Sequence, residues 1–365
     1  MRLEDQILSH QDVCNGVTIG KDSEGIGSFA LSEGVVGTFL NNPYIKDRNS
    51  PLVLLGRIDD DVCGRIIYFP TRLRINGIIE ESLGASSLLV NERGRDYSIG
   101  ARLMMYPIQS KKCKYLLYAG ISKMAEPLYK KLLKFEWFDI PCKWQPRNTR
   151  FLYQSIGLRG VLLNLATCLS NIILRPMIGL STFLSCKTVG QYEVKMLKEV
   201  PQWVEDIVAE DTHKYMEYHS RQWFEWVLKY NFCANKNDIQ KLFGVYKDGI
   251  PVGFFLLKER QVSIPEKGID NVVFGTMIEW GVKKETQLNE YAINKLAFSH
   301  YSNRVDIVQA ISDNHVILKK ISKYLFIRHG NANFAFRDLT KSLDKDYKQM
   351  QNWRIRVGYS DVAFY

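Results

Sequence analysis

Two stretches of this 365-residue chain repeat one order of expected elements, and this repeat limits the folds open to it more than any other feature. The order is an antiparallel hairpin, a strand, a helix, a second strand and a second helix. The first copy occupies residues 51–70, 86–90, 101–105, 114–119 and 124–135. The second copy occupies residues 243–259, 274–281, 285–300, 306–311 and 314–326. Since a strand–helix–strand crossover joins parallel neighbours, the sequence predicts an α/β chain with a mixed sheet in each of two tandem domains.

The domain boundaries follow from this repeat. We place an N-terminal domain at residues 1–150, an apolar helical linker at 151–190 and a C-terminal domain at 191–365. A chain of 365 residues suits two hydrophobic cores of ordinary size better than one. The first 50 residues are expected to be irregular, because glycines interrupt their short apolar runs, and residues 202–230 are expected to be mostly helical.

The composition, 46% hydrophobic and 24% charged, is typical of a folded globular protein. The net charge of +10 favours an anionic ligand. Because no stretch forms a dense Lys/Arg tract, we expect no nucleic-acid partner. A small ligand rich in phosphate explains the charge equally well.

Seven cysteines are scattered along the chain, and no two of them form a CxxC pair. An odd, scattered set argues against a disulfide framework or a zinc site, so no metal is expected. The first ten residues carry acids and no apolar core, which excludes a signal peptide. Together these features predict a cytoplasmic protein. They leave the oligomeric state open, with a homodimer as one option.

The segment Gly160–Leu174 is the strongest membrane candidate. It is shorter than the roughly 20 apolar residues that a span needs, and Asn164 and Asn171 interrupt it. We expect a buried helix that joins the two domains and no stable membrane span. An interfacial membrane helix is the alternative.

The segment after the strand at 86–90 carries the clearest chemical signal. It contains Arg95, Ser98 and Gly100 in the spacing R-x-x-S-x-G, and a helix follows. Small residues let the backbone approach a ligand closely, and amides at a helix N-terminus bind anions. Arg93 and Arg95 add donors suited to phosphate. With no G-K-[ST] and no G-x-G-x-x-G, the pattern predicts a pyrophosphate cradle that is neither a P-loop nor a dinucleotide site.

This segment resembles motif A of the GNAT superfamily of N-acyltransferases, [QR]-x-x-G-x-[GA], which binds the pyrophosphate of coenzyme A. Arg95 matches the first position and Gly100 the last, whereas Ser98 replaces the usual central glycine. The resemblance implies an acyl-coenzyme A co-substrate. The residues expected to bind it are Val90, Arg93, Arg95, Asp96, Tyr97, Ser98, Ile99 and Gly100.

The helix that follows extends the resemblance over residues 50–140. Ala125, Leu128 and Tyr129 match the family's A-x-x-L-Y element. In the second half the resemblance is topological only, because the segment after Trp280 has no glycine-rich loop. We therefore expect two tandem GNAT-like domains, of which the second is degenerate in the loop that binds coenzyme A.

The resemblance implies direct attack of an acceptor amine on the thioester carbonyl, with a strand amide binding the oxyanion. Tyr129 is the match for the general acid that protonates the leaving thiolate. Glu279 and His315 are the candidate general bases, Glu80 and Glu81 are weaker ones, and a neutral amine would need none. Cys113 and Cys142 are expected to be buried structural thiols rather than nucleophiles.

The acceptor is expected to bind to the C-terminal domain. Trp280, Trp353 and Tyr359 are candidates for stacking on it, and Asp361 is a candidate for holding the amine. The tail 352–365 resembles the ending of GNAT-like proteins from bacterial surface-polysaccharide gene sets. This resemblance implies a nucleotide-linked deoxyamino sugar, with deoxythymidine diphosphate as the expected carrier.

Two other classes of protein stay open. One is a Fem-like aminoacyltransferase that uses aminoacyl-tRNA, although no heptad run for the usual coiled-coil arm is present. The other is a non-catalytic binding module that keeps the GNAT fold. Calorimetry with coenzyme A would separate the module from an enzyme.

Overall fold

The computed structural model describes residues 2–15, 29–111, 113–232, 238–264 and 269–364. These residues form two compact units, and the chain passes between them four times. Unit 1 consists of residues 1–139, 213–234 and 333–365, and unit 2 of residues 140–212 and 235–332. The glycine-rich stretch 16–28 and Cys233 lie outside the described residues.

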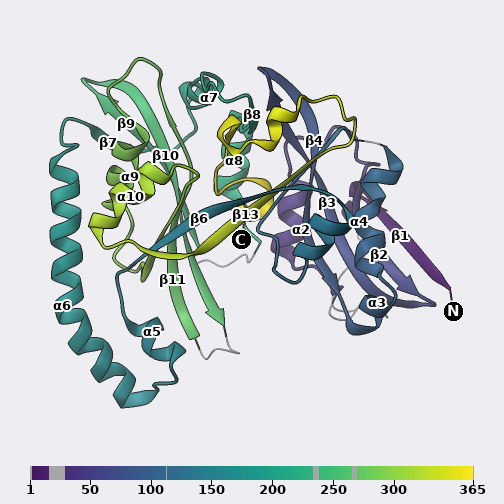
Figure 1. Cartoon of the computed structure of the whole chain (residues 1–365), viewed down its shortest axis with the longest axis horizontal. Coiled ribbons are helices and arrows are strands. Elements are labelled where there is room, and N and C mark those ends of the chain that lie inside the picture. The colour runs from purple at the N-terminus through teal and green to yellow at the C-terminus, as the bar shows by residue number, and fades with distance from the viewer. Residues whose placement is uncertain (1, 16–28, 112, 233–237, 265–268, 365) are drawn as a thin grey trace. The chain divides into compact units, whose positions relative to one another are not determined.

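The sheet of unit 1 has the strand order β1-β2-β3-β4-β5-β13 (Figure 1). Its strands are β1 (Leu3–Ser9), β2 (Pro51–Ile58), β3 (Asp61–Ile75), β4 (Ile78–Val90), β5 (Tyr115–Ala119) and the last part of β13 (Ile327–Asp338). The strands β1 to β4 are antiparallel neighbours, β4 and β5 are parallel, and β13 pairs antiparallel with β5. Two short strands, β8 (Tyr215–Glu217) and β14 (Trp353–Arg354), pair with each other, and β8 also pairs with the end of β3.

The helix α4 (Ile99–Ser110) packs against β2, β3 and β4 of unit 1 (Figure 1). It buries Ile99, Leu103 and Met104 in a core that includes Tyr68 from β3 and Tyr118 from β5. The other helices of this unit are α1 (His10–Cys14), α2 (Glu33–Leu40), α3 (Glu92–Asp96), η2 (Leu128–Leu132), α8 (Arg221–Lys229), η5 (Lys345–Lys348), η6 (Met350–Asn352) and η7 (Ser360–Phe364).

The sheet of unit 2 has the order β6-β12-β11-β10-β9-β7. Its strands are β6 (Glu136–Pro146, from Ile140 on), β7 (Glu193–Met196), β9 (Ile239–Lys247), β10 (Ile250–Ile264), β11 (Ile269–Val282) and β12 (Ile307–Ile311). Its helices are α5 (Arg150–Ser155), α6 (Gly160–Lys187), α7 (Gln202–Ala209), α9 (Glu290–Phe298), α10 (His315–Ile321) and η4 (Ser322–Tyr324). The side chains of Phe255, Trp280 and Ile293 lie in its core. As predicted, both units combine a mixed sheet with helices.

The division of the chain differs from the contiguous domains that the repeat predicts. Residues 213–234 and 333–365 belong to unit 1 rather than to a C-terminal domain. The physical reason is strand pairing, because β8 pairs with β3, β14 with β8, and Phe334–Asp338 of β13 with β5. Such pairings join residues far apart in sequence, and no local pattern specifies them.

Two local expectations also differ from the structure. The first 50 residues are not simply irregular, since β1 and α2 form there, with Ser32 capping α2. The stretch 202–230 is helical over most of its length, as predicted, but the helix is not continuous, because β8 separates α7 from α8. Ser220 ends the interruption as the N-cap of α8, and pairing with β3 keeps residues 215–217 extended.

The expectation of a buried helix at 160–174 is wrong. The helix α6 extends to Lys187, and within Gly160–Ser185 only Leu163, Asn171, Ile178, Ser181 and Ser185 are buried. Within the described parts of the chain it is the one helix that is long and apolar enough, by length and composition, to cross a membrane.

Candidate functional site

The turn between β4 and α4 is largely exposed and ends in a strained residue. Ser98, the N-cap of α4, has a φ of 56° and makes no side-chain cap hydrogen bond. Its carbonyl accepts the amide of Arg102 at 3.1 Å, so the amides of residues 99–101 precede the first intrahelical bond of α4. The side chain of Ser98 thus leaves the N-terminal amides of this 12-residue helix uncapped.

Glycine is needed within this turn for close packing. A Cβ at Gly94 would lie 2.4 Å from the carbonyl oxygen of Cys63, and a Cβ at Gly100 would lie 3.2 Å from Cγ2 of Val90. The Asn91 side chain accepts the amide of Gly94 at 2.7 Å and caps α3. Packing on the β3 side therefore fixes the path of the turn.

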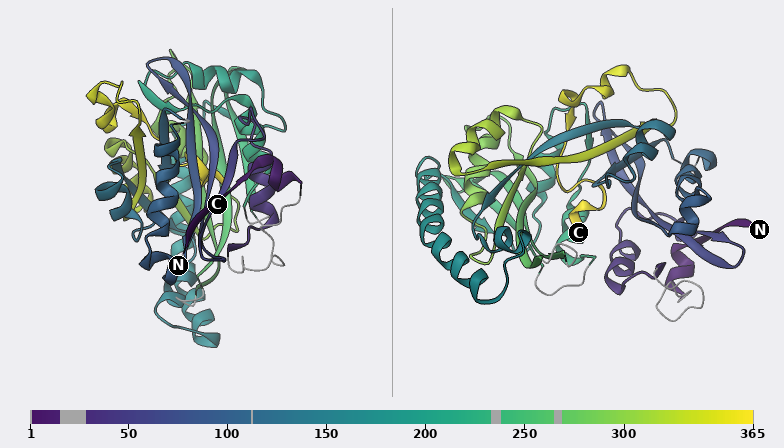
Figure 2. Two further views of the ribbon diagram at one scale, coloured as in Figure 1. Left: turned by 90° about the vertical axis from the view of Figure 1, so that its right-hand side faces the viewer. Right: turned by 60° about the horizontal axis from the view of Figure 1, so that its bottom comes forward.

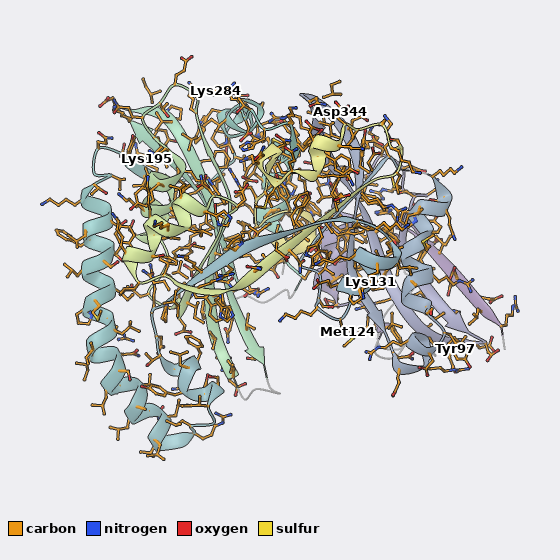
Figure 3. The ribbon with its side chains drawn as sticks, in the orientation of Figure 1. Tyr97, Met124, Lys131, Lys195, Lys284 and Asp344 are labelled. Carbon is orange, nitrogen blue, oxygen red and sulfur yellow. The ribbon has the colours of Figure 1, made fainter. Side chains whose placement is uncertain are left out.

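Arginines 93 and 95 have different surroundings. The guanidinium of Arg93 pairs with Asp61 at 2.7 Å and with Asp59 at 3.2 Å, both in the β2–β3 turn. Arg95, Asp96 and Tyr97 are exposed, and Figure 3 shows Tyr97 at the outer edge of this region. Arg93 is thus already engaged by two carboxylates, whereas Arg95 is the exposed guanidinium of the turn.

Strands β4 and β5 separate along their length. Their register contains one pair, Leu83 with Leu116. Beyond it, β4 carries a bulge, because Ser86 lies opposite Ile67 and Leu89 lies opposite Arg65. Ser87, in the bulge, has a φ of 52°. A bulge disrupts the ladder locally and re-aims the main chain, here beside the gap between β4 and β5.

The helix η7, near the C-terminus, packs against both β4 and β5. It brings Asp361 to the strand gap, where the carboxyl is 4% exposed and hydrogen bonds with the Ser86 side chain. Burial raises the pKa of Asp361 to about 7, and the negative charge of Glu217 adds to this rise. A carboxyl with this pKa can exchange a proton near neutral pH.

Tyr129 lies in the core of unit 1 near Asp361. Its hydroxyl contacts Sδ of Met104 at 3.7 Å, and its ring packs on Tyr118 and Phe135. Burial raises the pKa of Tyr129 far above its usual range, and the charge of Asp361 contributes. The phenol is therefore protonated at neutral pH, as a proton donor must be.

Sequence reasoning did not single out Glu217 and His219, which lie beside Asp361's helix. Oε2 of Glu217 accepts the amide of Ser360 at 2.6 Å and lies 3.9 Å from Nε2 of His219. The imidazole of His219 stacks on Trp223 at 3.5 Å. Residues 215–219 show no alternation of apolar and polar side chains and were expected to be helical, so the sequence carried no signal for these two residues.

Of the other predicted residues in unit 1, Trp353 and Tyr359 are fully buried. Nε1 of Trp353 donates to the carbonyl of Tyr347 at 2.6 Å, and the indole packs between Phe334 and Phe336. The hydroxyl of Tyr359 donates to the carbonyl of Arg354, and its ring meets His219 edge-on at 5.5 Å. Both side chains anchor the C-terminal segment.

The predicted residues of unit 2 are dispersed. Glu279 is fully buried on β11, where Oε1 accepts the amide of Trp280 at 2.9 Å. Trp280 belongs to the apolar core. His315 is exposed at the start of α10, next to its cap Asn314. These residues form no common site within unit 2, in contrast to Asp361 and Tyr129 in unit 1.

The two cysteines considered as nucleophiles have raised pKa values, and the described residues contain no metal cluster. Burial raises the pKa of Cys113 to about 11 and that of Cys142 to about 12, and neither cysteine forms a disulfide. No group of three His, Cys, Asp or Glu side chains in the described segments could hold a metal ion. Glu80 pairs with Lys114 at 3.0 Å and Glu81 with Lys46.

Comparison with known proteins supports the fold. No protein-family model and no curated protein matches the sequence. Among solved structures, N-myristoyltransferase of Saccharomyces cerevisiae with bound myristoyl-CoA is 12% identical, with a TM-score of 0.55 over 92% of this chain and 82% of that one. A GCN5-related N-acetyltransferase from Anabaena variabilis is 9% identical, with a TM-score of 0.55 over 93% and 73%. A probable N-acyltransferase from Enterococcus faecalis is 10% identical, with a TM-score of 0.52 over 93% and 73%. The chain thus has the fold of GNAT-type N-acyltransferases.

Proposed function

We propose that this protein is an N-acyltransferase that takes its acyl group from acyl-coenzyme A. The observation that carries the proposal is the arrangement in unit 1, where β4 separates from β5 and leads through the short helix α3 to Ser98, the exposed N-cap of α4. The fold shared with N-acyltransferases supports the same activity.

The first turn of α4 would hold the pyrophosphate. The amides of residues 99–101 and the positive end of the helix dipole favour an anion there. Arg95 would add a guanidinium, whereas Arg93 is held by Asp59 and Asp61. The pantetheine arm would then run along β4 toward its bulge.

The thioester would lie at the β4 bulge. An amide of the bulge would donate to the carbonyl oxygen as the acceptor nitrogen attacks the carbon and the tetrahedral intermediate forms. The carbon–sulfur bond then breaks, and the products are an amide and the free thiol of coenzyme A. One proton must leave the nitrogen, and one must reach the sulfur.

Asp361 is the carboxylate that would accept the proton from the amine. Its pKa of about 7 provides both a populated basic form at neutral pH and enough basicity to take a proton in the transition state. The Tyr129 phenol, protonated because its pKa is raised, would donate to the departing sulfur. Direct attack with two bound substrates then needs no covalent enzyme intermediate.

For the acceptor we propose the amine of a deoxyamino sugar carried on a nucleoside diphosphate, with deoxythymidine as the expected nucleoside. Unit 1 contains a cavity of about 1250 Å³ that is large enough for such a ligand. Its wall contains Glu80 and Glu81, which pair with Lys114 and Lys46, and four further cationic side chains that suit a diphosphate, namely Arg72, Lys111, Arg337 and Lys341. The net charge of +10 agrees with an anionic acceptor.

The test is release of free thiol from acyl-coenzyme A in the presence of a panel of amines. The panel contains amino-sugar nucleotides, the same sugars without the nucleotide, and peptides with a free N-terminus. We expect thiol release with the amino-sugar nucleotides and an amide product with the mass of the acylated sugar.

Two outcomes would correct the proposal at different levels. Thiol release with peptides but not with amino-sugar nucleotides would replace the acceptor and keep the reaction. No binding of coenzyme A in calorimetry, together with no thiol release, would replace the enzyme by a binding module.

A further inference from the structure

The helix α6 carries its large apolar side chains on the side that faces away from unit 2. In Figure 1 and in the right-hand view of Figure 2, α6 runs along the outside of this unit, and Figure 3 shows side chains projecting from its outer side. Val161 is 81% exposed, Ile173 66% and Phe183 64%. The same stripe includes Leu162, Leu165, Leu169, Ile172, Met177, Leu180 and Leu184, all exposed.

The side of α6 that faces unit 2 buries the polar residues Asn171, Ser181 and Ser185 beside the apolar residues Leu163 and Ile178. Oδ1 of Asn171 accepts the amide of Thr149 at 3.1 Å, and its Nδ2 donates to Asn148 at 3.0 Å. Ser170 hydrogen bonds with Tyr153 of α5. These contacts fix the rotation of the helix about its axis, so the exposure of the apolar stripe is specified by hydrogen bonds.

Such a stripe is costly in water. A contiguous apolar patch of this kind on a folded protein marks a surface that another apolar phase covers. In a water-soluble bundle the faces would be reversed, with the apolar stripe inward.

The chain segment that contains α6 carries charge of one sign. Residues 140–192 contain no Asp or Glu, although the whole chain has 39 acidic residues. Arg159 and Lys187 lie at the two ends of α6 and Arg175 near its middle, and all three are exposed. Basic residues beside an apolar stripe are typical of helices that lie in the headgroup region of an anionic bilayer.

A lysine cluster adjoins the C-terminal end of α6. The ammonium groups of Lys295, Lys320 and Lys323 lie 4.4, 5.4 and 5.8 Å from the ring centre of Tyr291. Nζ of Lys295 donates to Oγ1 of Thr188, directly after α6. Three cations around one ring repel one another, and a phosphate would relieve that repulsion. The cluster is therefore suited to an anionic headgroup.

We propose that α6 and this lysine cluster bind unit 2 to the surface of an anionic lipid bilayer. The apolar stripe enters the boundary between headgroups and acyl chains. Arg159, Arg175 and Lys187 meet the lipid phosphates together with Lys320 and Lys323, the two exposed lysines of the cluster, whereas Lys295 is buried beneath them.

Two other arrangements fit the structure less well. A membrane span would pull α6 away from Thr149 and Tyr153 and would leave Asn164, Asn171 and Arg175 without water. In a symmetric dimer through α6, the basic residues Arg159, Arg175 and Lys187 of one copy would face the same basic surface of the other copy. The helix α6 has no acidic residue that could pair with them.

The test is flotation of the full-length protein with vesicles of phosphatidylcholine alone or with added phosphatidylglycerol. We expect flotation only with the anionic vesicles, and weaker flotation as salt is raised. The charge variant Lys187→Gln, Lys320→Gln, Lys323→Gln should bind roughly 100-fold more weakly, about fivefold for each lysine. The stripe variant Leu169→Gln, Ile173→Gln, Leu180→Gln should not float.

Matched controls keep the test specific. Ile250→Gln, Val316→Gln, Ile327→Gln replaces exposed apolar residues of unit 2 outside α6. Lys198→Gln, Lys283→Gln, Lys284→Gln removes three exposed lysines elsewhere in unit 2. Both controls should float like the unchanged protein. Circular dichroism verifies that every variant keeps its helices.

Three results would overturn the proposal. The first is the absence of flotation with anionic vesicles. The second is a dimer in sedimentation analysis that the stripe variant abolishes, since this would make a second copy the occupant. The third is retention in membranes after an alkaline wash, which would indicate a span.

Discussion

The two units contain the same strand–turn–helix–strand element, but the N-terminus of its helix is capped differently in each unit. In unit 1, Ser98 begins α4 with a left-handed backbone and no side-chain cap. In unit 2, Asn289 begins α9 and its side chain accepts the amide of Ala292 at 3.0 Å. The first turn of α9 is thus capped from within the chain, whereas the first turn of α4 keeps its anion-binding character. The same topology therefore allows a helix N-terminus that is suited to an anion in unit 1 and a helix N-terminus that is capped by its own side chain in unit 2.

The strand pairs show the same contrast. β4 and β5 share the single pair Leu83–Leu116, whereas β11 and β12 share three, from Phe274–Ile307 to Thr276–Gln309. In the last of these residue pairs, Oγ1 of Thr276 also donates to Oε1 of Gln309 at 2.8 Å. Both β4 and β11 carry a bulge. The bulge is thus common to the two units, and the separation of the strands distinguishes unit 1.

The sharpest way to break this comparison is Asp361→Asn. If unit 1 alone carries the reaction, acyl transfer should fall roughly 100- to 1000-fold, because the base is lost while the hydrogen bond to Ser86 can persist. Steady-state thiol release measures it. The control is Asp306→Asn in unit 2, another buried carboxyl with a raised pKa. Equal losses of turnover per folded molecule in the two variants would contradict the assignment of the site to unit 1.

The pH dependence of acyl transfer tests the same role of Asp361. With a pKa of about 7, Asp361 should make acyl transfer rise about tenfold per pH unit below pH 7 and level off above it. Measurement of kcat from pH 5 to 9 tests this expectation, with acyl-coenzyme A saturating. A profile that keeps rising far above pH 7 would transfer the role to another group.

The stability of unit 1 should change with pH in the opposite direction to acyl transfer. The folded pKa of Asp361 exceeds the unfolded value of about 3.9. The folded state therefore holds the extra proton between about pH 4 and 7, and this contribution to stability is lost as pH rises through that window. Asp361→Asn should thus stabilise unit 1 above pH 7, by at most about 4 kcal/mol, and much less at pH 4. Denaturant titrations at both pH values decide it.

A smaller effect is expected at the turn itself. Arg95→Ala should weaken binding of coenzyme A by about 1–3 kcal/mol if the guanidinium pairs with phosphate. Lys284→Ala, in the corresponding turn of unit 2, should leave the affinity unchanged. Titration calorimetry compares the two. An unchanged affinity for Arg95→Ala would remove that side chain from the site.

The smallest effect concerns the two helix starts. Ser98→Gly relieves a left-handed residue and should raise stability by up to about 1 kcal/mol. Asn289→Ala removes a cap and should lower it by about 1 kcal/mol. Thermal unfolding of the two variants measures the difference. A loss of stability in Ser98→Gly would mean that the serine side chain has a structural role.

Much of each unit's local structure could be predicted from the sequence. The β2–β3 hairpin, β4, β5, α4 and α10 all lie where alternation or helical spacing indicated. The start of a helix after the turn 91–98 was also expected, because R-x-x-S-x-G is a local pattern, and its role as a pyrophosphate cradle stays a prediction. The helix α6 was recognised as apolar, but its rotation depends on Asn171 and Ser170 meeting residues of α5 and the segment before it.

What the sequence alone determined was the order of elements, the turn 91–100 and the charge of the chain, since each depends on residues close together in sequence or on composition. Only the tertiary structure decided that the C-terminal segment returns to unit 1. It also placed Asp361 at the β4–β5 gap with Ser86 and gave its carboxyl a pKa near 7. Burial and electrostatic coupling arise from residues that the chain brings together over long separations, so a local pattern cannot specify them.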